Sequence, residues 1–284
     1  MSSAPRVLVT GASGFVGRSV MVDLGDRGCA VGELTRRDSS AAPTAVVERT
    51  KEFKPDVVIH LATHFLAGHD PDDIPELIRS NVEFGTVVAE AASRSGARLV
   101  TVESAWQHVN GSAYDPVSLY AATKQALSTV LAYYVNVRGL DSRVVTLFDT
   151  YGPHDTRPKL VPALLAAAKS GTIVQMSDGN QLIDLTYVDD VVRGIVGVAL
   201  EPGGAASSVL RTWDPVTIRQ LVQTIEVATG SAVAVEWGAR PARPREMTTD
   251  WVFGSSPAWW TAEISLEDGI RRCWDALADE GSRT

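Results

Sequence analysis

Two side chains that could move a proton together stand four residues apart in the segment Tyr120-Ala-Ala-Thr-Lys124. Residues 116–137 have helical spacing, so the phenol and the ammonium group would share one face of a helix. A lysine ammonium beside a tyrosine stabilises the phenolate, lowers the pKa of the phenol and tunes it for proton transfer near neutral pH. Tyr and Lys at this spacing also occur on solvent-exposed helix faces, so a catalytic role for this pair depends on the other motifs of the sequence.

A third side chain that could take part in the chemistry is the hydroxyl group of Ser104. Ser104 comes just after the apolar run 98–102, which reads as a strand of a parallel sheet. Ligands of open α/β sheets bind at the carboxyl ends of the strands, so Ser104 could donate to a substrate carbonyl or to the alkoxide formed from it. Glu103 should point away from the serine, because side chains alternate along a strand.

A glycine-rich turn, Gly11-x-x-Gly14-x-x-Gly17, follows the strand-like run 6–10 and opens a helical pattern. Glycines there permit a tight turn and let a pyrophosphate approach the helix N-terminus. A plain structural turn is the alternative. The second strand, 30–35, ends in Thr35-Arg36-Arg37, where an NAD site would need a carboxylate. Two guanidinium groups suit the 2′-phosphate of NADP(H), which is therefore the expected cofactor, unless both arginines are simply solvated.

The elements that would hold these residues alternate between strand and helix. Continuously apolar strands between helices indicate an α/β protein with a doubly wound parallel (Rossmann) sheet. We expect a Rossmann domain at 1–150, to which 184–202 returns, and a smaller C-terminal α+β region at 151–183 and 203–284 for substrate. The usual third strand is missing or reduced to a few residues around 39–44. The expected strands lie at 6–10, 30–35, 57–61, 98–102 and 144–148, and the helices between them at 45–54, 74–94 and 116–137.

The composition of the chain disfavours several classes of function. The 284 residues carry 26 Lys and Arg against 34 Asp and Glu, a net charge of −8, which disfavours nucleic acid or anionic membranes as partners. No apolar run reaches the roughly 20 residues of a membrane span. Cys29 and Cys273 form no paired motif, so a reducing cytoplasm is expected. The histidines do not cluster at metal-ligand spacing, and no metal site is expected.

Several motifs follow one another along nearly the whole chain. They are the glycine turn, His60-Leu-Ala62, Asn81 with Phe84-Gly-Thr86, Ser104, the Tyr120/Lys124 pair, Tyr151-Gly-Pro153 and the late segment Ser265-Leu-Glu-Asp-Gly269. In this order they resemble the motifs of the extended short-chain dehydrogenase/reductases (the NAD-dependent epimerase/dehydratase family). The narrower segments 104–108, 119–125 and 149–155 are most similar to NDP-4-keto-6-deoxyhexose reductases such as CDP-abequose synthases.

This resemblance implies a role for each matching residue. Tyr120 would be the general acid, Ser104 would bind the C4 oxygen of a sugar, and Lys124 would bind the nicotinamide ribose and keep the pKa of Tyr120 low. The expected cofactor contacts are Gly11, Ser13, Gly14, Phe15, Val16, Gly17, Arg36, Arg37, Leu61, Ala62, Thr63, Asn81, Tyr120 and Lys124. The expected nucleotide-sugar contacts are Ser104, Trp106, His108, Asp149, His154, Arg157, Lys159 and Arg245.

One departure from the family's dehydratases bears on the reaction. Those enzymes carry an Asp-Glu acid/base pair directly after the serine or threonine, whereas here Ala105 and Trp106 follow Ser104, and neither can transfer a proton. The leading hypothesis is therefore NADPH-dependent reduction of the C4 keto group of a dTDP- or CDP-linked 4-keto-6-deoxyhexose. The alternatives are a nucleotide-sugar epimerase with tightly bound NAD and a non-catalytic dinucleotide-binding protein.

Two wider expectations follow, one from this resemblance and one from composition. The helical stretches 74–94 and 116–137 are similar to those that pair between subunits of family dimers, so a homodimer is expected. The second stretch also has more apolar residues than one face of a sheet needs. The composition of the whole protein, with 21 arginines against 5 lysines, hints at a GC-rich bacterial genome and a natural-product (antibiotic) deoxysugar pathway.

Overall fold

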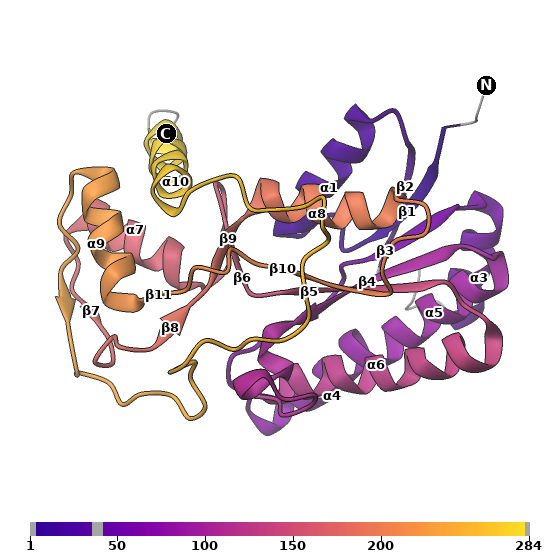
Figure 1. Ribbon diagram of the computed structural model, residues 1–284, viewed down its shortest axis with the longest axis horizontal. Helices are drawn as coiled ribbons and strands as arrows, with labels where there is room; N and C mark the ends of the chain where they lie inside the picture. Colours follow the sequence, from indigo (N-terminus) through magenta and orange to yellow (C-terminus); the bar gives the residue numbers. More distant parts are fainter. Residues whose placement is uncertain (1–3, 36–41, 282–284) are drawn as a thin grey trace.

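A six-stranded parallel sheet forms the centre of the protein (Figure 1). The computed structural model describes residues 4–35 and 42–281. The strand order is β10-β5-β4-β3-β1-β2, and every neighbouring pair is parallel, which confirms the predicted doubly wound Rossmann sheet. The strands are β1 (Arg6–Thr10), β2 (Ala30–Leu34), β3 (Val57–His60), β4 (Arg98–Ser104), β5 (Ser142–Leu147) and β10 (Ser207–Leu210).

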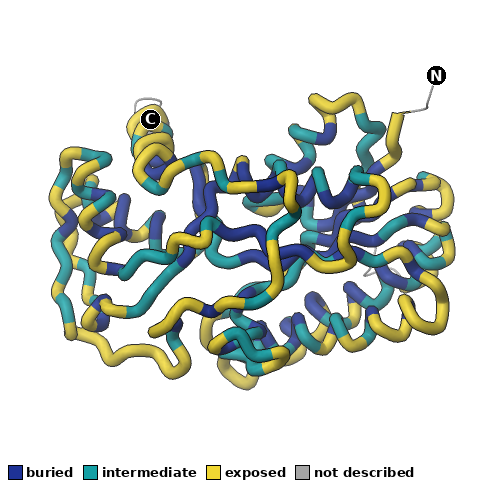
Figure 2. The backbone as a smooth tube through the Cα atoms, in the orientation of Figure 1, coloured by how far each residue is buried: buried dark blue, intermediate teal, exposed yellow. Residues whose placement is uncertain are grey.

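Helices cover both faces of the sheet, as the continuously apolar strands require. In β1, Val7 and Val9 pack into the core beneath α1 and α8, whereas Leu8 between them packs into the core beneath α3, α5 and α6. Figure 2 shows the resulting dark band of buried backbone between exposed outer turns. These helices are α1 (Phe15–Asp26), α3 (Pro43–Phe53), α5 (Phe84–Ser95), α6 (Leu119–Arg138) and α8 (Val188–Leu200).

The helix predicted over 74–94 is interrupted. It begins as α4 (Ile74–Ile78), widens into a π-helical turn, η2 (Arg79–Glu83), and continues as α5. A π-turn inserts an extra residue into a helix and is often found at functional sites. Here the turn carries Asn81, whose side chain is turned into the protein and is 2% exposed.

A smaller lobe lies beside the sheet, at the left of Figure 1. It contains α7 (Leu160–Ser170), α9 (Ile218–Thr229) and α10 (Leu266–Gly281). Three pairs of short strands complete the described architecture: β7 (Val174–Gln175) with β12 (Val235–Glu236), β8 (Leu182–Ile183) with β11 (Val216–Thr217), and β6 (Asp149–Tyr151) with β9 (Leu185–Tyr187).

The boundary between the two parts differs from the sequence-based division at one strand. β10 falls within the range 203–284 assigned to substrate binding, but it pairs with β5 as the outer strand of the main sheet. Arg211, directly after β10, is fully buried and forms ion pairs with Asp184 (2.8 Å) and Asp250 (2.6 Å). These ion pairs join the end of β10 to Asp184, which lies between β8 and β9, and to Asp250, which lies between β12 and α10.

At the opposite edge of the sheet, the sequence predicts that a further strand is missing or reduced to a few residues around 39–44, a segment whose first half lies outside the described residues. Among the described residues β2 is the outermost strand, and α3 follows it from Pro43. Arg36 and Arg37, the residues expected to distinguish NADP from NAD, lie outside the described residues. No helix in the described ranges is both long and apolar enough to span a membrane.

Candidate active site

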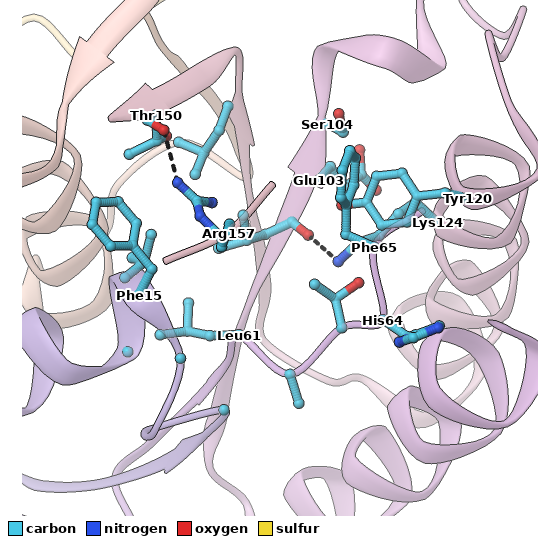
Figure 3. Close-up of a pocket in the computed structure, with 18 of the residues that line it drawn as sticks. Phe15, Leu61, His64, Phe65, Glu103, Ser104, Tyr120, Lys124, Thr150 and Arg157 are labelled. Carbon is cyan, nitrogen blue, oxygen red and sulfur yellow. Dashed lines mark hydrogen bonds between the residues drawn. The ribbon is translucent and has the colours of Figure 1, made fainter. Parts of the chain in front are cut away.

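A cavity of about 540 Å³ opens at the carboxyl ends of β1, β3, β4 and β5. Its lining combines the glycine turn, the segment after β3, Ser104 and residues of α6, together with the segments 147–150 and 157–159. Figure 3 shows Ser104, Tyr120 and Lys124 on one side of this cavity and Phe15 and Arg157 on the other. Residues predicted from separate motifs thus lie in one place.

The glycine turn is a cradle that side chains would fill. Gly11 has φ +70°, and a Cβ added to it would lie 2.7 Å from the backbone nitrogen of Ala62. A Cβ on Gly17 would lie 2.0 Å from the carbonyl oxygen of Gly11. Gly14 is the N-cap of α1, so the free N–H groups of that helix's first turn lie beside the cavity. This arrangement fits the pyrophosphate of a dinucleotide.

The remaining predicted cofactor contacts divide into two groups. Ser13, Phe15, Val16, Leu61, Ala62 and Thr63 line the cavity. Asn81 is not among the lining residues; its Oδ1 accepts from the Thr63 hydroxyl (3.0 Å) and the His64 N–H (2.7 Å). Its Nδ2 donates to the His64 carbonyl (3.0 Å) and to the Thr123 hydroxyl (2.9 Å). Asn81 therefore holds the cavity wall against α6.

Tyr120 and Lys124 lie in the first turns of α6, which Ser118 caps by accepting a hydrogen bond from Ala121 N–H (3.3 Å). Both side chains are buried. Burial raises the pKa of Tyr120 to about 12, and a hydrogen bond with Thr63 opposes this rise. The expected lowering of the Tyr120 pKa by Lys124 is therefore absent from this structure, because the cost of burying a phenolate dominates.

The ammonium group of Lys124 has its own environment. Its Nζ donates to the carbonyl oxygen of Val102 at 3.0 Å and lies 6.0 Å from the centre of the Tyr120 ring. Burial lowers the pKa of Lys124 to about 8, and the negative charge of Glu103 opposes this fall. Close to pH 8, this lysine can therefore exist in both protonation states.

Ser104 ends β4 and caps the short helix η3 (Ala105–Gln107) that follows. Its Oγ accepts from Trp106 N–H at 3.3 Å, which leaves the hydroxyl proton to donate elsewhere. Glu103 was expected to point away from the site. It faces α6, where it accepts a hydrogen bond from the Ser128 hydroxyl, yet it still contributes to the cavity lining because α6 forms that wall.

An aromatic wall stands in front of the tyrosine. The ring of Phe65 meets the Tyr120 ring edge-on, with centroids 5.0 Å apart, and meets the Trp106 ring at 5.7 Å. The Lys159 Nζ lies 3.9 Å from the centre of the Phe65 ring and 3.3 Å from Asp149 Oδ1. Sequence reasoning did not select Phe65, because a lone aromatic residue in a loop has no distinguishing spacing.

The predicted substrate contacts are only partly brought together. Ser104, Trp106, Asp149, Arg157 and Lys159 line the cavity. Arg157 is already bound to Asp155 (2.7 Å) and to the Thr150 carbonyl (2.8 Å), as Figure 3 shows for the latter.

Three predicted substrate contacts lie outside the cavity lining. His108 Nδ1 is 3.0 Å from the Ser112 carbonyl, and its ring packs on Phe253. His154, with φ +58°, lines a separate hollow between α1 and α8. Arg245 forms an ion pair with Asp115. For His108 and Arg245, these local partners hold the side chain away from the cavity. The described residues also contain no cluster of metal-ligating side chains.

The glycine cradle and the Ser-Tyr-Lys set on a Rossmann sheet define a nicotinamide-dependent oxidoreductase of the short-chain dehydrogenase/reductase type. The model of the NAD dependent epimerase/dehydratase family matches residues 7–208, and the chain belongs to this family. This match covers the sheet except for Arg6 and the last two residues of β10, and it includes Ser104, Tyr120 and Lys124.

Known relatives include enzymes of different activities. The chain is 24% identical to a CDP-abequose synthase of Yersinia pseudotuberculosis over 70% of this chain and 75% of the relative. It is 29% identical to a UDP-glucose 4-epimerase of Mycolicibacterium smegmatis, over 94% of this chain and 96% of the relative. A dTDP-glucose 4,6-dehydratase of Streptomyces griseus is 27% identical over 80% and 76%. The relatives are thus named for modifications of nucleotide-linked sugars.

Solved structures share the fold. MoeE5 in complex with UDP-glucose and NAD aligns with a TM-score of 0.81 at 24% identity, covering 97% of this chain and 99% of MoeE5. The UDP-glucose 4-epimerase of Thermotoga maritima aligns with a TM-score of 0.84 at 20% identity, covering 97% and 99%. At these identities the likeness establishes the fold alone.

Proposed function

We propose that the protein is an NADPH-dependent reductase of the C4 keto group of a nucleotide-linked (dTDP or CDP) 4-keto-6-deoxyhexose. One observation carries this proposal. Two hydroxyl donors, Ser104 and Tyr120, line the cavity, and the two residues that follow Ser104 are not an acid/base pair. Ala105 is buried and Trp106 presents an aromatic ring to the cavity. Neither residue can remove a proton from carbon, which disfavours dehydration.

The side chains have clear tasks in such a reduction. Tyr120, whose pKa is raised to about 12 by burial, holds its proton at neutral pH and can give it to the C4 oxygen as that oxygen gains charge. The Ser104 hydroxyl donates a second hydrogen bond to the same oxygen. The ammonium of Lys124 binds a ribose hydroxyl and adds positive charge to the site. When bound, the nicotinamide cofactor supplies the hydride.

The choice of NADPH rests on the end of β2. Thr35, which lines the cavity, has no negative charge, and Arg36 and Arg37 follow it in the sequence. A 2′-phosphate is repelled by a carboxylate and attracted by guanidinium groups. Because Glu33 of β2 also lines the cavity, the proposal of NADP(H) rests on the two arginines that follow Thr35.

A nucleotide-sugar epimerase is the second candidate. It is favoured by the 29% identity to the mycobacterial UDP-glucose 4-epimerase along almost the full length of both chains. An epimerase oxidises and then reduces its sugar, uses the same three residues and keeps NAD bound between turnovers. The two candidates differ in net cofactor consumption.

Absorbance at 340 nm separates them. The substrate dTDP-4-keto-6-deoxyglucose is generated in situ, its CDP counterpart is tested alongside, and NADH is the parallel control. We expect rapid oxidation of NADPH and slow oxidation of NADH. No oxidation of either cofactor, together with NAD⁺ released on denaturing the purified protein, would favour the epimerase.

We further propose that the protein is a cytoplasmic homodimer that serves deoxysugar biosynthesis, as in antibiotic pathways. Apolar side chains remain exposed on α4 and α6, among them Ile78 (44%), Tyr133 (50%) and Val137 (65%). Such a surface suits burial against a second copy. Sedimentation at micromolar concentration tests the dimer, and a monomer would contradict it. The free thiols of Cys29 and Cys273 are consistent with a reducing compartment.

A further inference from the structure

The lysine of the site has a carboxylate neighbour that the proposed reaction does not use. Glu103 and Lys124 both line the cavity, Glu103 from the end of β4 and Lys124 from α6 (Figure 3). Two contacts connect the strand to the helix at this point. Lys124 Nζ donates to the carbonyl of Val102, the residue before Glu103, and Ser128, one helical turn after Lys124, donates to the Glu103 carboxylate.

These contacts fix the carboxylate rather than leaving it to solvent. The Ser128 hydroxyl also lies 3.1 Å from the Lys124 carbonyl, so Ser128 joins the backbone of the lysine to the side chain of the glutamate. A buried ammonium is costly without a compensating charge, because transfer from water removes its hydration. The carboxylate of Glu103 is the negative group that opposes this cost.

We propose that Glu103 is a positioning residue: its carboxylate, held by Ser128, keeps the Lys124 side chain charged inside the cavity. The proposal rests on the proposed function only in assigning Lys124 to the nicotinamide cofactor. It adds a residue that lies directly before Ser104 in the sequence and acts through another side chain. With Glu103 neutral, Lys124 would lose its proton at lower pH and its hold on the cofactor with it.

Other charged and titratable groups around Lys124 do not replace Glu103. His60, at the end of β3, interacts with the charge of Lys124, but burial lowers the pKa of His60 to about 3, so it is neutral in the working range. Tyr120, on the same helix, stays protonated with a pKa of about 12. Asp149 acts on Tyr120, and its carboxylate is paired with Lys159. Among the described residues, Glu103 is thus the carboxylate whose charge raises the pKa of Lys124.

The test is the binding of NADPH, followed by its fluorescence, between pH 6 and 9. This readout needs no sugar substrate and uses NADH instead if the wild-type protein binds it more tightly. The variants are E103Q, S128A and, as a control for loss of an exposed carboxylate, E267Q on α10, whose partner is Arg271. Circular dichroism checks the fold of each.

We expect wild-type binding to weaken as the pH rises through about 8, the pKa of Lys124. E103Q should bind no more weakly than wild type at pH 6 and roughly fivefold more weakly at pH 8. S128A should move in the same direction by less, and E267Q should follow wild type.

Superimposed curves for wild type and E103Q across the whole range would overturn the proposal. If E103Q does not fold, S128A decides it, and an unmoved S128A curve overturns it equally. A wild-type protein that binds the cofactor but reduces no sugar would contradict the proposed function while leaving this test intact.

Discussion

Replacing Gly11 with alanine tests whether the glycine turn is a cofactor cradle. Gly11 has φ +70°, and an added Cβ would meet three backbone atoms of Leu61 and Ala62 at 2.7–2.9 Å. Gly28 offers a matched control, because it has φ +74° but nothing within 4 Å of its added Cβ. Both variants take on the left-handed strain of a non-glycine residue, about 1–2 kcal/mol. Only G11A adds a backbone clash.

The clash sets the difference between the two variants. To restore an ordinary 3.4 Å contact, the turn and the segment after β3 must separate by about 0.7 Å. Crowding of this kind costs about 1–3 kcal/mol beyond the strain, so G11A should lose that much more unfolding free energy than G28A in urea titrations. A displacement of this size should also weaken NADPH binding at least about tenfold in G11A. The reasoning fails if G11A binds NADPH like G28A and is no less stable.

Four further predictions test other parts of the site. Y120F should lower kcat by about 10²–10⁴-fold through loss of the proton donor, with NADPH binding by fluorescence nearly unchanged; normal turnover would rule out Tyr120 as the acid. F65A, which removes the edge-on contact with Tyr120, should lower kcat/KM about tenfold while F65L retains more activity, and equal loss in both would argue against an aromatic role. R211M leaves the buried Asp184 carboxylate unpaired and should cost about 3–5 kcal/mol in urea unfolding; a cost below about 1 kcal/mol would contradict this. Because the protonated form of Lys124 attracts the cofactor, NADPH affinity should be full below pH 8 and decline above it, and a flat profile to pH 9 would contradict the assigned pKa.

Local sequence patterns were sufficient to predict the parallel sheet and to select the candidate reacting groups. The strand 6–10 was predicted to the residue, because a β-branched run meets a glycine turn directly at its end. Ser104, Tyr120 and Lys124 could be selected because each stands at a fixed place relative to a strand end or a helix turn. Their meeting in one cavity follows from the parallel sheet, which gathers strand ends at one edge.

Features set by distant contacts could not be read in the same way. The pairing of β10 with β5 brings together segments about sixty residues apart, and the four residues of β10, of which only Val209 and Leu210 are apolar, do not indicate their partner strand. At the π-turn, the Asn81 side chain makes four hydrogen bonds to the loop after β3 and to α6, and no local pattern indicates these partners. The pKa of Tyr120 depends on burial, which the spacing of Tyr120 and Lys124 does not reveal. The sequence likewise does not reveal that Arg245, a predicted substrate contact, forms an ion pair with Asp115.

Net transfer of hydride to C4 of a nucleotide-linked sugar is the central claim. The most direct measurement uses NADPH deuterated at the transferable position of its nicotinamide, with dTDP- and CDP-4-keto-6-deoxyhexoses as substrates and mass spectrometry and NMR of the product. We expect one deuterium per product molecule, located at C4, and one NADP⁺ formed for each product. A C4-epimerised sugar without deuterium, formed by enzyme that retains its own NAD⁺, would contradict the claim and identify an epimerase.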